Sequence, residues 1–325
     1  MSDIGQLSTL AVYAAMASYL IALVAFSVDL SALTDRGPKD RPRKAAGIAM
    51  ATTYVGVGLH AVGVILRGIA AGRVPWANMY EFSLVFSLVA VLIFVVMQQF
   101  RDVRFLGAFL MLLTVLGLGV GTMVLYVDAD GVEPILDSYW LVIHVSVATI
   151  AVGIFSVAAV ISVVQLIKDR QERKALAAHR GATGHAAQEE QAAGGDGGAT
   201  TAVLTADEAK QGFWSRWAAA IPGSVDLERF AYRLNAVAFL LWTFTLIAGA
   251  IWAEHAWGRP WGWDAKETWS FVIWVAYAAY LHARATRGWE GRRAAYFCLA
   301  GFALVLGNYF IVNLLLNTRH GYAFA

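Results

Sequence analysis

Long apolar runs separated by short polar stretches form the main pattern along this chain of 325 residues. Each run is long enough for a helix to cross about 30 Å of hydrocarbon, and none alternates strictly between apolar and polar residues as a barrel strand does. Helices are therefore predicted, because they satisfy their backbone hydrogen bonds within lipid. About eight spans are expected, at residues 8–33, 46–72, 79–99, 105–127, 140–167, 231–254, 268–286 and 294–316.

The composition agrees with a membrane protein. Hydrophobic residues make up 59% of the chain and charged residues 15%, with a mean hydropathy of +0.58, whereas a soluble domain has about 45–50% apolar and about 25% charged residues. The fold class predicted is an all-α polytopic transmembrane bundle. The first run is expected to remain as a helix, since it is too long for a signal peptide and lacks a basic leader.

Lysine and arginine residues gather in the loops after the first, third, fifth and seventh predicted spans, such as Arg41, Arg104, Arg170 and Arg292. Basic loops favour the cytoplasmic side, so both termini are expected on the outer side of a bacterial plasma membrane. The net charge of +2 hides this asymmetry between the two faces. It gives no reason to expect a nucleic-acid partner.

The spans divide the chain into three parts: residues 1–167 with five helices, 168–228 as a cytoplasmic loop, and 229–325 with three helices. Within the loop, residues 175–198 lack apolar periodicity and are predicted to be disordered, with His179 and His185 solvated. An interfacial helix is expected near 213–221. The single cysteine, Cys298, is predicted to be a buried small residue, and the chain has no disulfide framework.

The densest chemical signal lies between the sixth and seventh predicted spans, on the outer side. Trp257, Trp261, Trp263 and Trp269 fall within thirteen residues, and the glycines and proline among them keep the first half of the segment from being helical. Tryptophans also anchor ordinary helix ends at headgroup depth, which is the alternative explanation. The density of rings favours a platform at residues 257–269 for a flat amphipathic ligand.

Charged residues interrupt this platform. Arg259 and Lys266 are cations that suit the carboxylates of such a ligand. Asp264 and Glu267 have the spacing of a capping box at the start of the next helix, and a structural cap is expected there at least as strongly as ligand contact. The two roles are compatible, because a well-capped helix would fix the geometry of the platform before it.

Histidines extend the candidate site. His144, one turn into the fifth span, and His320, in the outer tail, are predicted on the same side as the platform. Each alone is typical of an interfacial histidine, but together with the tryptophans they favour axial ligation of haem iron. His60 and His282 lie at membrane depth, too far apart in depth to share one haem, and each has packing as an alternative role. His255 is expected to be a local hydrogen-bond partner.

A polar group surrounds the second loop. It contains Arg67 near the end of the second span, followed by Asn78 and Glu81. A snorkelling arginine beside an interfacial turn is one explanation. Propionate binding, or support of the platform, is the other.

The run from Trp257 to Trp269 resembles the tryptophan-rich signature of haem-handling membrane proteins, and it looks most like that of the CcsA (ResC) family of system II cytochrome c synthases. Actinobacterial members of this family are often labelled CcsB. The segments Pro75–Glu81 and Tyr139–Val145 resemble further family motifs, and Asn317–Tyr322 matches loosely. Ala265 stands where the family usually has proline. The CcmC and CcmF families share tryptophan-rich segments, but the chain length and helix count favour CcsA.

The resemblance implies that His144 and His320 ligate an external haem, while His282 ligates an internal haem with a residue of a CcsB- or ResB-type partner. It implies a haem lyase subunit that delivers haem b, as bound substrate, to an apocytochrome c with a Cys-x-x-Cys-His motif. Thiol-reducing proteins would contribute indirectly. No residue need act as a nucleophile, because the contribution expected is the positioning of reactants.

Two other functions would use similar residues. A membrane b-type cytochrome for electron transfer would need paired histidines at matched depths on facing helices, whereas the best pair here is predicted at the outer surface. A transporter of a flat organic solute would use the tryptophans as its outer gate. Bound haem that depends on His144 or His320 would oppose transport.

Overall fold

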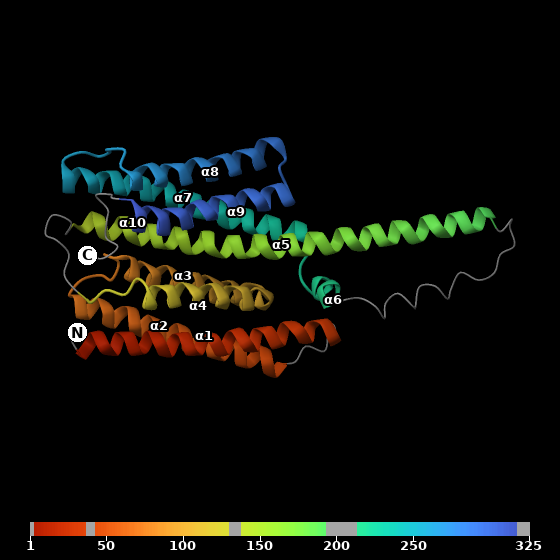
Figure 1. Ribbon diagram of the computed structural model, residues 1–325, viewed down its shortest axis with the longest axis horizontal. Helices are drawn as coiled ribbons and strands as arrows, with labels where there is room; N and C mark the ends of the chain where they lie inside the picture. Colours follow the sequence, from red (N-terminus) through yellow and green to blue (C-terminus); the bar gives the residue numbers. More distant parts are fainter. Residues whose placement is uncertain (1–2, 37–42, 130–137, 193–212, 317–325) are drawn as a thin grey trace.

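The computed structural model describes residues 3–36, 43–129, 138–192 and 213–316, and every regular element within them is helical. Long helices run side by side along a common axis (Figure 1). The elements are α1 (Asp3–Arg36), α2 (Arg43–Ala71), α3 (Met79–Phe100), η2 (Arg104–Leu106), α4 (Gly107–Met123), α5 (Tyr139–Ala192), α6 (Phe213–Ala220), α7 (Ser224–Trp257), α8 (Ala265–Arg287), α9 (Arg292–Gly307), the π-helical η4 (Asn308–Val312) and α10 (Asn313–Leu315).

Seven helical segments of the described chain are long and apolar enough to cross a membrane. They correspond to all the predicted spans except residues 268–286, which form α8. This helix has 23 residues, long enough to cross hydrocarbon at about 1.5 Å per residue, but it is less apolar than the others. It packs against α7 and α9. The all-α polytopic membrane bundle predicted from the sequence is confirmed.

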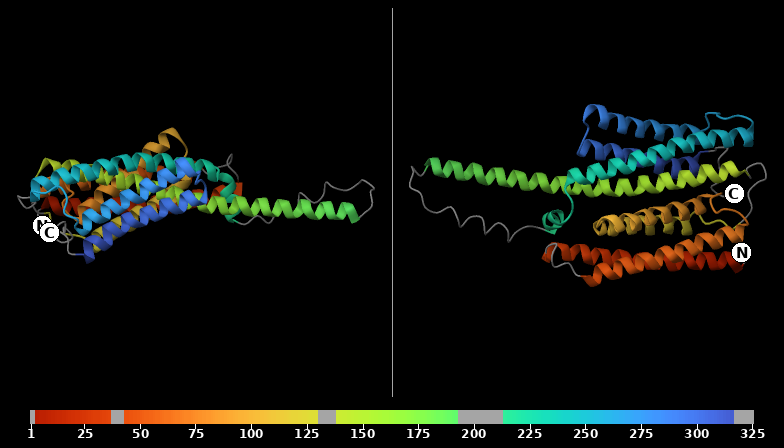
Figure 2. Two further views of the ribbon diagram at one scale, coloured as in Figure 1. Left: turned by 90° about the horizontal axis from the view of Figure 1, so that it is seen from above. Right: turned by 180° about the vertical axis from the view of Figure 1, so that it is seen from behind.

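Helix α5 joins two halves of the bundle. The helices α1–α4 lie on one side of it and α7–α9 on the other (Figures 1 and 2). Residues of α5 contribute to both apolar cores, for example Ile161 to the core with Phe26 and Phe94, and Phe155 to the core with Tyr277. The ring of Phe155 stacks on that of Tyr277 with centroids 3.8 Å apart. The second half forms most of the candidate site.

The ends of the bundle follow the alternation predicted from the loops. The start of α1, the α7–α8 connection and α10 lie at one end, and the α3–α4 and α8–α9 connections lie at the other (Figure 1). Arg104 and Arg292, two of the arginines on which the predicted cytoplasmic orientation rests, adjoin the connections at the second end. The tryptophan-rich segment is therefore separated from those arginines by the length of the bundle.

The structure differs from the disorder expected within residues 175–198. Helix α5 continues to Ala192 and extends beyond the bundle (Figure 2), and residues 193–198 lie outside the described residues. Alanine, arginine, glutamine and glutamate, which make up most of residues 175–192, favour helix, so an extension of a formed helix needs no apolar face of its own. His179 is exposed on this extension, as expected.

Helix α6 lies where a helix was expected near 213–221. The side chain of Trp217 is fully buried and packs against Phe109 of α4, with ring centroids 6.3 Å apart. This aromatic group therefore faces the bundle rather than lipid. Cys298 is buried, as expected, and its Sγ accepts a hydrogen bond of 3.2 Å from the Asn235 amide.

Candidate functional site

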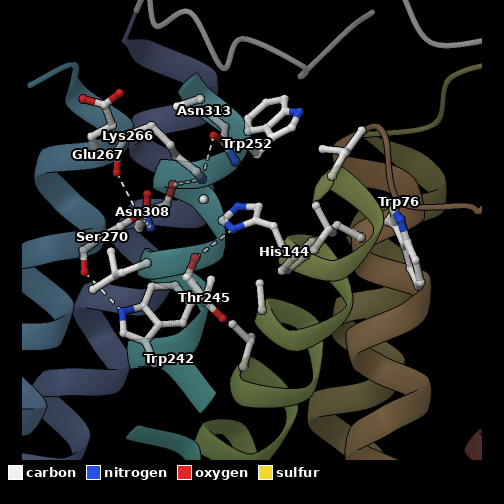
Figure 3. Close-up of a pocket in the computed structure, with 18 of the residues that line it drawn as sticks. Trp76, His144, Trp242, Thr245, Trp252, Lys266, Glu267, Ser270, Asn308 and Asn313 are labelled. Atoms are coloured by element: carbon white, nitrogen blue, oxygen red, sulfur yellow. Dashed lines mark hydrogen bonds between the residues drawn. The ribbon is translucent and has the colours of Figure 1, made fainter. Parts of the chain in front are cut away.

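A cavity of about 180 Å³ lies between α5, α7, α8 and η4, at the end of the bundle that holds the tryptophan-rich segment. Its wall is mainly apolar and aromatic. Four indoles line it, from the α2–α3 loop, α7 and the α7–α8 loop: Trp76, Trp242, Trp252 and Trp261. Figure 3 shows side chains from both halves of the bundle converging on this space.

His144 of α5 lines this cavity and is half-buried. Its Nδ1 lies 2.9 Å from the carbonyl oxygen of Thr245 in α7. A carbonyl only accepts hydrogen bonds, so Nδ1 donates, and the lone pair of the neutral ring is on Nε2. The ring also stacks on Trp252, with centroids 6.1 Å apart and planes 13° apart. These contacts fix the tautomer and plane of a candidate metal ligand.

The four predicted platform tryptophans do not form one flat shelf. Trp261 lines the cavity, while Trp257 packs edge-on against Trp252 with centroids 5.1 Å apart. Trp269 is not among the residues that line the cavity and lies beside Gly307 of α9. Trp263 is 68% exposed. It adopts a left-handed backbone with φ 57°, rare for a bulky residue, and its indole meets Trp261 edge-on.

Asp264 and Glu267 form the capping box expected from their spacing. The Asp264 Oδ1 accepts a 2.8 Å bond from the Glu267 backbone N–H. The Glu267 Oε2 in turn accepts bonds from the backbone N–H groups of Gly262 and Asp264, at 2.7 and 3.2 Å. The Glu267 carboxylate thus holds the loop that carries Trp261 over the cavity.

Lys266 contributes a cation to the cavity wall. Its Nζ donates to Asn313 Oδ1 at 2.9 Å and to the Asn308 carbonyl at 3.4 Å, linking α8 to η4 and α10. Asn308 is buried, and its Oδ1 has no hydrogen-bond partner within the described part of the chain. The guanidinium of Arg259 packs over Gly262 instead of lining the cavity. Lys266 and the two asparagines give this wall its polar character.

Arg67 and Glu81 belong to a buried, closed network that does not line the cavity, and Asn78 lies between this network and the cavity. The Arg67 Nε donates to Glu81 Oε1 at 2.9 Å, and its Nη2 donates to the carbonyls of Val127 and Asp128. Arg73 donates to Glu81 Oε2 at 2.7 Å. Asn78 lines the cavity and also caps α3, because its Oδ1 accepts from the Glu81 N–H at 2.9 Å. These contacts favour support over direct contact of Arg67 and Glu81 with a ligand.

No other histidine within the described part of the chain lines this cavity. His60 is fully buried between α1 and α2, with Nδ1 3.3 Å from the Tyr19 hydroxyl. His255 is exposed and bonds through Nδ1 to the Ile251 carbonyl of its own helix. His282 is exposed on α8, roughly 24 Å along the axis from Lys266 at about 1.5 Å per residue. His320 lies outside the described residues, so its relation to His144 stays a prediction.

Several residues of the cavity were missed by the sequence analysis. Trp252 and Thr245 lie within the sixth span, where apolar spacing indicated packing only, and Asn308 and Asn313 lie in the eighth. A polar residue in a membrane span is itself a signal, and the two asparagines meet that criterion. Trp252 and Thr245 are identified as site residues by their contacts with His144, which depend on the packing of α7 against α5.

The donor set suits a flat ligand with carboxylates and a metal already held in a ring. No group of three metal-ligating residues gathers anywhere in the ranges the structure describes. A single imidazole holds iron firmly only where a macrocycle supplies the in-plane ligands. Aromatic walls, one oriented imidazole and a lysine are the groups that haem, as a substrate, would require.

Comparisons with known proteins identify the family of this chain. The family described as Cytochrome C assembly protein matches residues 76–320. The cytochrome c biogenesis protein CcsA of Synechococcus sp. (strain CC9902) is 33% identical over 265 residues, which cover 80% of this chain and 81% of that protein. The protein of the same name from Gloeobacter violaceus is 35% identical over 275 residues, covering 79% and 80%.

Among solved structures, the cytochrome c heme lyase CcmF is similar, with a TM-score of 0.58 and 16% identity. The match covers the whole of this chain and 49% of CcmF, so this chain spans about half the length of that protein. At this identity the likeness shows a shared fold. Because the family match and two relatives above 30% identity extend over most of the sequence, this chain belongs to the CcsA family of cytochrome c assembly proteins.

Proposed function

We propose that this chain binds haem in the cavity beside His144 and delivers it for covalent attachment to apocytochrome c. Its curated relatives are named cytochrome c biogenesis proteins, which supports a role in cytochrome c maturation. The observation that carries the finer proposal is the oriented imidazole of His144, which lines an aromatic cavity with its Nδ1 bonded to Thr245.

In this proposal each group on the cavity wall has a distinct task. His144 binds haem iron through Nε2, and His320 supplies the opposite ligand from the tail. Trp242, Trp252 and Trp261 pack against the macrocycle, and Lys266 pairs with a propionate. The cavity lies on the outer side of a bacterial plasma membrane, as the basic loops at the other end of the bundle favour.

The chemistry of attachment places few demands on this chain. Each cysteine thiol of the apocytochrome adds across a haem vinyl group: sulfur bonds to one vinyl carbon, and the thiol hydrogen ends on the other. No oxidant or nucleophilic side chain of this chain is needed, so its contribution is to hold haem in one orientation. A CcsB- or ResB-type partner completes the synthase, and its haem ligand pairs with the exposed His282 at the internal site.

The experiment compares wild type with His144→Ala, each coexpressed with that partner and an apocytochrome c that carries Cys-x-x-Cys-His. We expect covalent holocytochrome c, and haem bound to the purified complex, to fall about tenfold or more in the variant. His255→Ala is the matched control, because this exposed histidine does not line the cavity; its Nδ1 bonds to its own helix and its ring contacts Trp140. Wild-type haem content and yield in His144→Ala would overturn the proposal.

A further inference from the structure

We propose that Gly249 is a positioning residue for His144, and that the absence of a side chain at Gly249 lets α7 hold the imidazole with Nε2 directed to the cavity. This inference rests on the proposed function, in which His144 ligates haem iron. It assigns a role to a glycine that lies within a membrane helix, about two turns before the end of α7, and has no side-chain chemistry of its own.

Three groups on one face of α7 enclose the imidazole. Thr245, Gly249 and Trp252 are spaced by four and three residues, so they lie one above another along the helix. The Thr245 carbonyl accepts from Nδ1 at 2.9 Å, and Trp252 stacks on the ring. Gly249 occupies the turn between them and lines the same cavity.

The space at Gly249 is filled by the ring itself. A Cβ atom added there would lie 2.7 Å from Cε1 and 2.9 Å from Nδ1 of His144. Carbon atoms in contact are ordinarily about 3.5–4.0 Å apart, so a methyl group would displace the imidazole. The ring cannot move far from Gly249 without lengthening its hydrogen bond to Thr245, because Gly249 and Thr245 belong to the same helix.

The displacement would change the chemistry of the ligand as well as its place. The bond from Nδ1 to a carbonyl keeps the proton on Nδ1, leaves Nε2 as the ligating nitrogen, and makes that nitrogen more basic. A ring pushed away from α7 loses this bond and its stacking on Trp252. Its Nε2 would then meet haem iron at a different angle, or not at all.

Gly58 of α2 is a matched control, because it also lies inside a membrane helix but a Cβ atom added to it would meet no neighbouring side chain within 4 Å. Alanine favours helix more than glycine does, so neither Gly58→Ala nor Gly249→Ala removes an interaction that holds the backbone. In Gly249→Ala the imidazole has the cavity to move into, so the bundle is expected to fold. If Gly249 positions the imidazole, Gly249→Ala changes haem binding while the fold is kept. If Gly249 has only a structural role, Gly249→Ala and Gly58→Ala behave alike.

The test uses the purified complex with its partner, titrated with haemin and followed by absorption spectroscopy and by the midpoint potential of the bound iron. We expect Gly249→Ala to bind haemin about 10–100-fold more weakly, with the absorption of imidazole-ligated iron lost, and the thermal unfolding midpoint unchanged or raised. Added free imidazole should restore the spectrum, because it occupies the iron without the tether of α5. Gly58→Ala should match wild type in every readout.

A wild-type spectrum and affinity in Gly249→Ala, an equal loss in Gly58→Ala, or a loss that imidazole does not restore would each overturn the inference. His144→Gly separates this result from the proposed function. If His144→Gly keeps the wild-type spectrum without added imidazole, His144 is not a ligand and the proposed function fails with the inference. If His144→Gly loses the spectrum while Gly249→Ala keeps it, the inference alone fails.

Discussion

The two halves of the bundle bury the same kinds of polar residue, but these residues have different roles. In the first half, His60, Arg67 and Glu81 are enclosed by protein, and the two charged side chains bind each other. His144 of α5 and Lys266 of the second half line a cavity. Hydrogen bonds to Thr245 and Asn313 hold these two side chains at the cavity wall. Burial at membrane depth is therefore a poor guide to ligand binding, whereas an oriented group beside an open space is a better one.

His60 and His144 show this difference most directly. His60 has an aromatic neighbour, Tyr19, and His144 has Trp252, and each ring has one nitrogen within hydrogen-bond distance of a neighbouring oxygen. The difference lies in what surrounds them. His60 is 0% exposed and does not line the cavity, whereas His144 lines it at the junction of the two halves.

The largest effect is expected from breaking the closed ion pair. Glu81→Ala leaves Arg67 buried without its carboxylate, and removing one partner of a buried pair costs about 3–5 kcal/mol. Thermal or denaturant unfolding of the purified protein in detergent measures this loss. The control is Asp102→Ala, which breaks the exposed pair with Arg104 and should cost no more than about 1 kcal/mol. Equal losses in the two variants would contradict a structural role for the closed network.

A smaller effect is expected at His60. His60→Ala leaves a cavity between α1 and α2 and should lower the free energy of unfolding by about 2–4 kcal/mol, as for other large-to-small changes in a core. Haem bound to the purified complex should be unchanged, because His60 does not line the cavity beside His144. Haem loss with normal stability would make His60 a ligand and remove the distinction between the two histidines.

The sequence alone predicted most of the fold because lipid leaves few choices to a backbone. The lengths of the apolar runs located the spans, and the basic loops indicated which connections lie at the same end of the bundle. Both signals are reliable because hydrogen bonding and charge act on whole segments. The limit is the helix at residues 175–192, where disorder was expected; the weakly apolar α8 lies where a span was predicted. Packing against α7 and α9 accompanies the helix at α8, whereas helix propensity accounts for residues 175–192, which extend beyond the bundle.

The candidate site was less predictable, because it depends on contacts between distant segments. The spacing of Asp264 and Glu267 was sufficient for the capping box, which is local. The exposure of Trp263 and the place of Trp252 were not predictable, because no spacing rule indicates which indole turns toward His144. The sequence left open whether Arg67 and Glu81 mark an interfacial turn, bind a propionate or support the platform, since charge alone does not reveal that the two bind each other.

The smallest effect is expected at Asp264, where capping and ligand contact remained alternatives. Asp264→Ala removes the acceptor for the Glu267 N–H and should cost about 1 kcal/mol of stability, whereas Asp264→Asn should cost little because asparagine caps a helix as well as aspartate does. Unfolding measurements and haemin titration of both variants are needed together. If Asp264 only caps α8, haem affinity follows stability, and Asp264→Asn behaves as wild type in both assays. If haem affinity falls in Asp264→Asn while stability does not, the carboxylate itself contacts the ligand, because the cap is then intact and only the charge has been lost.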